Sequence, residues 1–344
     1  MNGVMTRKRS NDQERGNRPQ FWQVVWRAFV LLSLANVPQA RTGSLGLEER
    51  FASDPAMRGW TIFGEPKLFR WNATNQNLEV TWDSRQTNSF FYRSLGTVLA
   101  KSDDFSFSFD LQLDEIAIGI KPAQPFTFQL AAGLMNLRVA TSRGFVRGTG
   151  SQSPNLVEFN YFPDSGFGAT VSPILVSSNN QFIPSFSFPL ELTPTDQFHI
   201  AISYSAFNQV LRTQMTRNRE PFGPIKDVKL PATFTDFRVD TIAVMSYSDA
   251  KADGSLLARG VIDNVIFESS ATALSIAGAQ IVNQRWQVEI FGRTNWIYSL
   301  ERTEDLATWQ SITPSTPGTG ASHVLREEGI ARPRGFYRIR AERP

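Results

Sequence analysis

The chain of 344 residues contains no cysteine and only two histidines, His199 and His323. The absence of thiols excludes disulfides, thiolate zinc sites, cysteine nucleophiles and a lipid anchor on cysteine. Two histidines are too few for a multi-histidine metal centre. A phosphate-binding loop and the G-x-S-x-G motif of hydrolases are also missing. The glycine-rich stretch Gly144–Gly150 has no lysine, so we expect a surface loop that exposes Arg143 and Arg147.

A clustered basic surface is absent as well, although the sequence pI is about 9.2. Residues 1–40 hold six basic and two acidic side chains. Subtracting them from the totals of 35 and 32 leaves 29 basic and 30 acidic side chains in the rest of the chain. Because nucleic-acid binding needs a cluster of basic residues, the sequence predicts no nucleic-acid partner.

The first 40 residues have the layout of a secretory signal peptide. Basic residues come first, an apolar run of eight residues follows at Ala28–Ala35, and small residues end the segment. An uncleaved anchor is the alternative, but a membrane-spanning helix needs roughly 20 apolar residues. We therefore predict that residues 1–40 are removed and that the mature chain has no transmembrane anchor. The expected location is extracellular, at the cell surface or in the periplasm.

Beyond this leader there is no long helical period, and short alternating runs separated by turns dominate. The clearest is Phe105–Leu113 (FSFSFDLQL), in which apolar residues occupy every second position. Such alternation is typical of antiparallel strands with one buried and one solvated face. Further expected strands are Leu78–Trp82, Phe126–Leu130, Leu156–Phe162, Phe198–Tyr204, Val210–Met215, Thr241–Ser246 and Val261–Phe267. The sequence thus predicts an all-β fold with an antiparallel two-sheet sandwich over residues 45–269.

A second, small β unit is predicted for residues 280–344, after a linker of small residues at Ser269–Ala279. Its expected strands are Arg285–Phe291, Trp296–Glu301 and Gly335–Arg340. The pattern Y-S-L-E-R-T-x-D-L-x-x-W, followed later by F-Y-R-I, resembles a small β module at the C-termini of secreted bacterial proteins. This resemblance implies an accessory role in attachment or surface display.

The stretch Asn155–Gly168 (NLVEFNYFPDSGFG) has the most suggestive side-chain chemistry. A strand here places Glu158 and Asn160 on one face, and the turn that follows it contains Asp164. Oxygen ligands at alternate positions can form a cation site or a sugar site. A plain polar strand face followed by a turn also explains them, and we favour that interpretation.

The order of segments resembles the L-type lectins of the concanavalin A-like superfamily. Ala123–Gly133 (AQPFTFQLAAG) resembles their A-D-G-[LIA]-x-F-x-[LA] segment, and NLVEFNYFPDSG resembles their V-E-F-D-T-[FY]-x-N metal strand. Thr241–Phe267 resembles their closing strand pair with its long loop. The resemblance implies a jelly-roll sandwich and carbohydrate binding.

The same resemblance implies which residues would bind ligands. The metal candidates are Glu158, Asn160 and Asp164, with calcium as the candidate ion, and the ligand-contact candidates are Gln124, Asn160, Tyr247, Asp249, Asp253 and Ser255. Gln124 stands where the lectins have their sugar-holding Asp, and Ser165–Ile174 lacks the later Asp and His of their metal site. Because calcium takes six to eight oxygen ligands, two carboxylates are too few, and we expect the two-metal site to be absent.

We expect a secreted, non-catalytic protein that binds a glycan or cell-envelope polysaccharide or mediates adhesion. A polysaccharide hydrolase or lyase and a purely structural envelope protein remain as alternatives. A retaining glycosidase needs two carboxyl groups about 5–5.5 Å apart, and the sequence displays no such motif. His199 lies in an alternating strand, where a structural role is expected. Trp60, Trp71 and Trp82 are expected in the core rather than as platforms for sugar rings.

Overall fold

The computed structural model describes residues 45–118, 129–147, 152–249, 255–269, 274–294, 296–329 and 335–343. The predicted leader lies outside these residues, as do Gln124 and Asp253. Within the described residues, no helix is both long enough and apolar enough to cross a membrane.

Two antiparallel sheets form the larger part of the fold. The strands of sheet 1 are β1 (Leu45–Glu49), β3 (Phe69–Asn72), β4 (Asn77–Asp83), β6 (Phe105–Ile118), β12 (Gln197–Ser205), β13 (Val210–Arg217), β14 (Glu220–Phe222), β15 (Val228–Lys229) and β17 (Leu256–Ser269). The strands of sheet 2 are β2 (Thr61–Phe63), β5 (Ser89–Leu99), β7 (Leu130–Met135), β8 (Leu156–Phe162), β9 (Thr170–Val171), β10 (Ile174–Val176), β11 (Phe182–Pro184) and β16 (Val239–Ser246). Short helical turns occur at η1 (Pro55–Arg58), η2 (Pro66–Leu68) and α1 (Leu137–Ala140).

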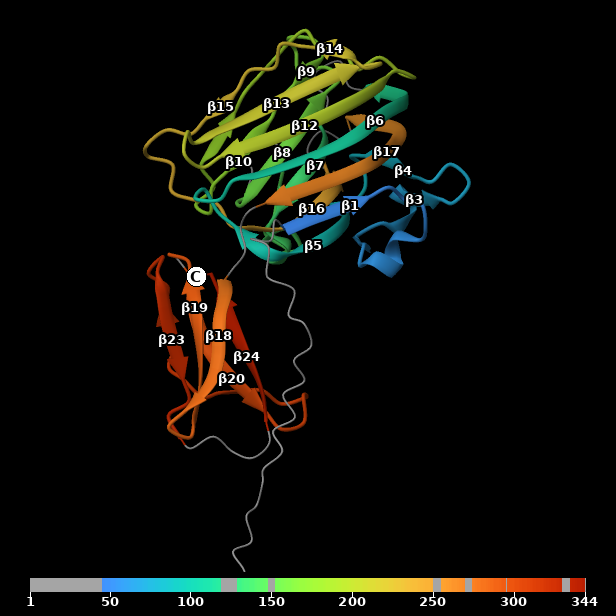
Figure 1. Ribbon diagram of the computed structural model, residues 1–344. Coiled ribbons are helices and arrows are strands. Elements are labelled where there is room, and N and C mark those ends of the chain that lie inside the picture. The colour runs from blue at the N-terminus through green and yellow to red at the C-terminus, as the bar shows by residue number, and fades with distance from the viewer. Residues whose placement is uncertain are drawn as a thin grey trace, which may run out of the picture. The chain divides into compact units, whose positions relative to one another are not determined.

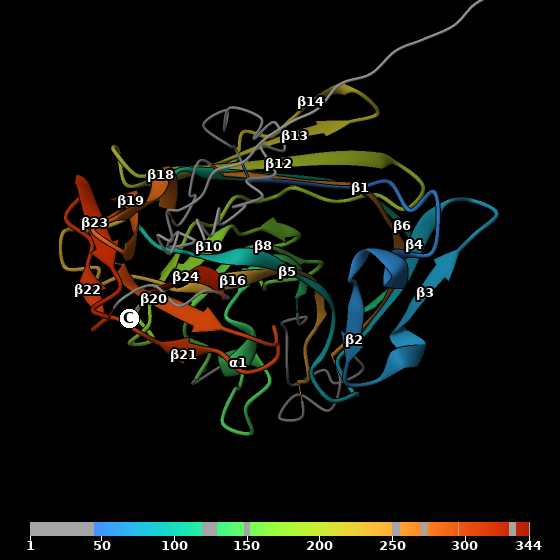
Figure 2. The same cartoon turned by 60° about the horizontal axis from the view of Figure 1, so that its bottom comes forward.

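The strand order identifies a sandwich with many crossovers between its layers. Sheet 1 runs β14-β13-β12-β6-β17-β4-β3, with β1 beside β17 and β15 beside β13. Sheet 2 runs β11-β10-β8-β7-β16-β5-β2, with β9 beside β8. Figure 1 shows the long strands of sheet 1 in front of those of sheet 2, and the turned view of Figure 2 separates β12 and β13 from β8 and β10. The predicted all-β antiparallel sandwich is confirmed.

Alternating phenylalanines close the space between the two sheets. Phe105, Phe107 and Phe109 of β6 are buried, whereas the serines between them are partly exposed. The ring of Phe109 meets that of Phe159 on β8 edge to face, with centroids 5.7 Å apart. Trp60 also lies in this core, as expected, and stacks on Phe91 at 4.8 Å. Trp82 is buried too, so the core role expected for both tryptophans is confirmed.

The C-terminal unit contains two further small antiparallel sheets. Sheet 3 has the order β18-β19-β23, and sheet 4 has the order β21-β20-β22 with β24 beside β20. Their bounds are β18 (Leu274–Val282), β19 (Arg285–Gly292), β20 (Ile297–Thr303), β21 (Gln310–Ser311), β22 (Thr316–Pro317), β23 (Ser322–Arg326) and β24 (Phe336–Glu342). The unit has its own apolar core, in which Val288, Ile290 and Leu300 are buried.

Two sequence-based boundaries differ from the structure. Residues 126–128 of the expected strand Phe126–Leu130 lie outside the described residues, and β7 begins at Leu130. The second half of the expected linker Ser269–Ala279 is wrong, because it belongs to β18. Small residues are compatible with an edge strand as well as with a linker, and composition alone does not distinguish a linker from a strand.

Candidate functional site

The antiparallel register gathers several predicted site residues at one edge of sheet 2. Leu130, the first residue of β7, pairs with Tyr161 near the end of β8 and with Ser246 at the end of β16. The turn after β8, which contains Asp164, and the segment after β16, which contains Tyr247, therefore leave the sheet at the same edge. We call this set of strand ends, with the loops that follow them, the loop edge of sheet 2.

A buried polar network lies under the loop edge and is centred on Glu158. Its Oε2 atom accepts a hydrogen bond from Nη2 of Arg147 at 2.7 Å, and its Oε1 atom accepts one from the hydroxyl of Tyr247. Gln129, with its side-chain oxygen turned toward Arg147, accepts hydrogen bonds from Nε at 3.2 Å and Nη2 at 2.9 Å. The guanidinium also lies over the Tyr247 ring, 5.4 Å from its centroid. Both carboxylate oxygens of Glu158 thus have protein partners.

The electrostatics of this network favour a charged pair beside a neutral phenol. Burial raises the pKa of Tyr247 well above its ordinary value, and the negative charge of Glu158 raises it further. Burial alone would lower the pKa of Arg147, but the neighbouring Glu158 outweighs it, so the net pKa is raised. Arg147 therefore stays a cation and Tyr247 stays protonated, which suits a fixed structural network.

The structure places the three predicted metal candidates in different surroundings. Asn160 is buried and donates a hydrogen bond from Nδ2 to the carbonyl of Ser172 at 3.3 Å. Asp164 lies in the turn after β8, where its Oδ1 atom accepts the N–H of Gly166 at 2.9 Å. Among the described residues, no group of three or more His, Cys, Asp or Glu side chains is suited to a metal ion. The expected solvated polar face of β8 is also wrong, because Glu158 and Asn160 are fully buried.

The segment on both sides of residues 250–254 is held by one hydrogen bond within it and one to the residue that follows β4. Ser255 is buried and donates from Oγ to Oδ2 of Asp249 at 2.9 Å. The backbone N–H of Asp249 donates to the carbonyl of Ser84 at 2.7 Å. Of the predicted contact residues, Tyr247, Asp249 and Ser255 are therefore near the loop edge, but two of them are buried.

Exposed phenylalanines form an aromatic strip at the loop edge, which we define as Phe167, Phe186 and Phe188. Phe167 is 72% exposed and Phe188 is 48% exposed, and their rings stack with centroids 5.5 Å apart. Ser185 and Ser187, on either side of Phe186, turn inward. Their hydroxyls bond to the backbone of Lys226, one as donor at 2.7 Å and one as acceptor at 2.9 Å.

The backbone that presents the strip is tied to the end of β8. Ser187 and Val171 exchange two backbone hydrogen bonds of 3.0 Å, and Val171 pairs with Tyr161. The tip that carries Phe167 is closed by the hydroxyl of Ser165, which lies 3.0 Å from the carbonyl of Gly168. Gly168 has a φ of +91°, which favours glycine. The aromatic side chains therefore project from a fixed surface.

Sequence reasoning missed both the strip and Arg147. In Ser185–Phe188, serine and phenylalanine alternate as they do in β6. Such alternation shows that the two kinds of side chain lie on opposite faces, but it does not show which face is buried. Arg147 was expected on a surface loop, yet it is buried against Glu158. The one signal in the sequence was Glu158, a carboxylate inside a mostly apolar strand, because a buried charge needs a partner of opposite charge.

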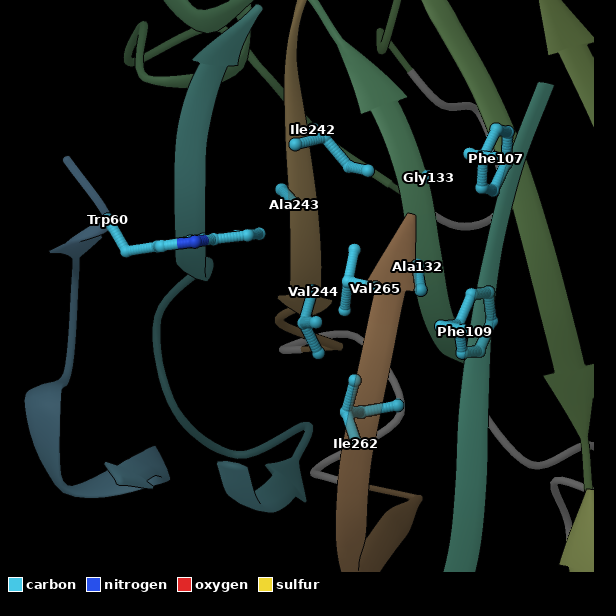
Figure 3. A pocket seen from close by; sticks show the side chains of 10 residues that line it. All are labelled: Trp60, Phe107, Phe109, Ala132, Gly133, Ile242, Ala243, Val244, Ile262 and Val265. Atoms are coloured by element: carbon cyan, nitrogen blue, oxygen red, sulfur yellow. The ribbon is translucent and has the colours of Figure 1, made fainter. Parts of the chain in front are cut away.

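A cavity in the sandwich core is no alternative site for a polar ligand. It has a volume of about 10 Å³ and lies between the sheets, lined by Trp60, Phe107, Phe109, Ala132, Gly133, Ile242, Ala243, Val244, Ile262 and Val265 (Figure 3). A void of this size holds at most one water, and an apolar void stays dry.

The outer face of sheet 1 brings together titratable groups from separate strands. His199 on β12 lies opposite Asp110 on β6, with Nδ1 and Oδ1 2.7 Å apart. Asn264 donates to the other oxygen of Asp110 at 2.8 Å, and Asp263 pairs with Asp110 in register. Partial burial raises the pKa of Asp263, and the charges of Asp110 and Glu49 raise it further. His199 is half-exposed and paired.

Comparisons with known proteins return structures only. No protein-family model and no curated protein matches the sequence. The chain is similar to peanut lectin at 14% identity, covering 66% of this chain and 97% of that chain, with a TM-score of 0.43. It is similar to the lectin UEA-II complexed with galactose at 13% identity, covering 65% and 98%, with a TM-score of 0.43.

A legume lectin-like domain from Entamoeba histolytica is 11% identical, with 64% of this chain and 95% of that chain covered and a TM-score of 0.39. These three solved structures are legume-type lectins or lectin-like domains, the class that the order of segments in the sequence resembles. The resemblance of the C-terminal unit to a module of secreted bacterial proteins stays a prediction.

Proposed function

We propose that this protein binds carbohydrate, without catalysis, at the loop edge of sheet 2. The observation that supports this most is the aromatic strip, in which Phe167 and Phe188 stack on each other while exposed. Sugar rings present apolar C–H faces, which pack on aromatic rings. Contiguous exposed apolar surface on a soluble protein commonly marks a binding site.

Polar groups at the loop edge suit the hydroxyl groups of a sugar. The turn after β8 offers the carboxylate of Asp164, and the segment after β16 offers Asp249. Binding sites of this kind combine apolar contact with a few placed polar groups. Gln124 and Asp253 remain proposed contacts from the sequence.

The proposed site needs no calcium at Glu158. Arg147 and Tyr247 already satisfy the two oxygens of that carboxylate, so a cation there would have to displace a buried guanidinium. Whether a calcium ion binds elsewhere at the loop edge is tested by comparing glycan binding with and without calcium.

Export is part of the proposal and rests on the leader sequence. An apolar run of eight residues after a basic segment fits a secretory signal. The proposed partner is a glycan or cell-envelope polysaccharide outside the cytoplasm.

A glycan array probed with the full chain, with and without calcium, tests the proposal. We expect binding to at least one glycan class in both conditions, and at least tenfold weaker binding for F167A and F188A. Phe207 is the matched control, because it is 95% exposed in the turn between β12 and β13. F207A should bind as the unmodified chain does. Flat signals for the unmodified chain in both conditions would remove the proposal.

Cleavage of a polysaccharide, by a hydrolase or a lyase reaction, is the second candidate function, and one observation favours it. His199 and Asp110 come from separate strands and meet at 2.7 Å, which is the kind of pair that acid–base chemistry needs. Release of reducing sugar or of unsaturated product from a polysaccharide panel tests this candidate. Activity that H199A abolishes would favour an enzyme, and inactivity on every substrate supports a binding protein.

A further inference from the structure

Strand β18 of the C-terminal unit is an open edge with almost no cover. Seven of its nine residues are exposed. Ile276 and Ile281 are 58% and 62% exposed, although β18 pairs on its other side with β19. A long exposed edge strand with apolar side chains is a template for pairing with another strand.

Two other edge strands of the same unit have charges that β18 lacks. Strand β23, at the opposite edge of sheet 3, includes Arg326, and β24 of sheet 4 includes Arg338, Arg340 and Glu342. Charged side chains on edge strands prevent pairing between molecules. The sequence of β18, LSIAGAQIV, contains no charged residue, so two copies can approach without charge repulsion.

A bulge in β18 makes the strand self-complementary. In the pairing with β19, Ile276 lies opposite Ile290, Ala279 opposite Val288 and Ile281 opposite Trp286, with a register shift after Ile276. Ile290 and Val288 are buried in the core of the unit, so Ile276 and Ala279 lie on the core side of the sheet. Without the shift, residues 276 and 281 would lie on opposite faces, because their separation is odd.

A two-fold axis through Ala279, perpendicular to the sheet, therefore pairs only residues that lie on the same face of the sheet. It places Ile276 of one strand opposite Ile281 of the other, Gly278 opposite Gln280, and Ala279 opposite itself. The two isoleucine pairs lie on the core side, and the Gly–Gln pairs lie on the outer side. The two bulges fall at symmetric positions, outside the central residues. Gly278 has open space around it, since a Cβ added there would have no other atom within 4 Å.

We propose that β18 pairs with β18 of a second copy of this chain, joining the two copies of sheet 3 into one six-stranded antiparallel sheet. Closed two-fold symmetry is the commonest arrangement of homodimers, and it uses the same patch on both copies. One strand pair buries less surface than the roughly 1,200 Å² of a stable interface, so the dimer should be weak. We expect dissociation at micromolar concentration.

Sedimentation velocity of the full chain between about 1 and 300 µM tests the pairing. The unmodified chain should shift from monomer to dimer over this range. A279K and A279E should each remain monomeric, because like charges would meet on the two-fold axis. An equimolar mixture of the two variants should dimerise again. V324K, an exposed change on β23, should dimerise as the unmodified chain does.

Two results would overturn the proposal. One is an unmodified chain that stays monomeric up to the highest concentration. The other is a dimer that A279K and A279E leave intact, since the interface would then lie elsewhere. Because Ala279 is exposed, both variants should unfold at the same temperature as the unmodified chain, which separates loss of pairing from loss of fold.

Discussion

Arg147 and Glu158 form an ion pair inside the sandwich, with Nη2 of the guanidinium 2.7 Å from Oε2 of the carboxylate. Both side chains are buried. The pair ties the segment that follows α1 to the middle of β8, and the Tyr247 hydroxyl joins the end of β16 to the same carboxylate. Three parts of the chain are thus fixed relative to the loop edge by one buried charge.

Removing one partner of this pair should be costly. R147M should lower the free energy of unfolding by about 3–5 kcal/mol, because the carboxylate of Glu158 would stay buried without its cation. Adding E158Q to R147M should restore part of the loss, since the amide is neutral and still accepts from Tyr247. Urea unfolding of the full chain measures both effects. If the double variant is no more stable than R147M, the buried charge is not the source of the loss.

Removal of divalent cations should leave the stability of the protein unchanged. A ligand that binds only the folded state at 100 times its Kd adds about 2.7 kcal/mol, which thermal unfolding detects easily. Because Glu158 is already bonded to Arg147 and Tyr247, we expect the same Tm in EDTA and in millimolar calcium. A rise in Tm with calcium that E158Q abolishes would place an ion at this carboxylate after all.

The alternation of apolar and polar residues in the sequence predicted where the strands lie better than it predicted which face of each strand is buried. The alternation in Phe105–Phe109 and in Ser185–Phe188 is the same, but the phenylalanines point into the core in the first and outward in the second. In β6 the cross-sheet neighbours are apolar, whereas at 185–188 the serines find the backbone of Lys226. That choice depends on a loop distant in sequence, so no local rule could supply it. Arg147, the partner of Glu158, was missed because the glycine-rich stretch that contains it predicts a surface loop.

The two groups of phenylalanines should respond differently to truncation. F107A should lower the free energy of unfolding by about 3–5 kcal/mol, because it opens a cavity in the sandwich core. F167A should change it by no more than about 0.5 kcal/mol, since that ring is mostly exposed. Thermal or urea unfolding distinguishes the two outcomes. A large loss for F167A would mean that the strip holds the loop edge together and is not free to bind.

The partly buried carboxylate of Asp263 should make stability depend on pH. Burial first, and then the charges of Asp110 and Glu49, raise its pKa in the folded state above the ordinary value near 3.9. For a raised pKa, the contribution to stability is full below about pH 3.9 and is lost as the pH rises through the folded value. D263N lacks this loss, so its stability relative to the unmodified chain should increase from pH 3 to pH 7.

Unfolding midpoints at pH 3, 5 and 7 measure this difference. E268Q, an exposed change on the same strand, is the control and should show a smaller dependence. A constant difference between D263N and the unmodified chain across the range would contradict a raised pKa at Asp263.

Close backbone packing should make Gly260 the least replaceable glycine of sheet 1. An ideal Cβ on Gly260 would lie 2.3 Å from the carbonyl oxygen of Gln112 on the neighbouring strand β6. The contact is with backbone, so β6 and β17 would have to separate, and we expect G260A to cost about 1–3 kcal/mol. G278A is the matched control, because that position is open and in an exposed strand, so its effect should stay within about 0.5 kcal/mol. Equal stability of the two variants in urea would show that β6 and β17 can separate freely at this point.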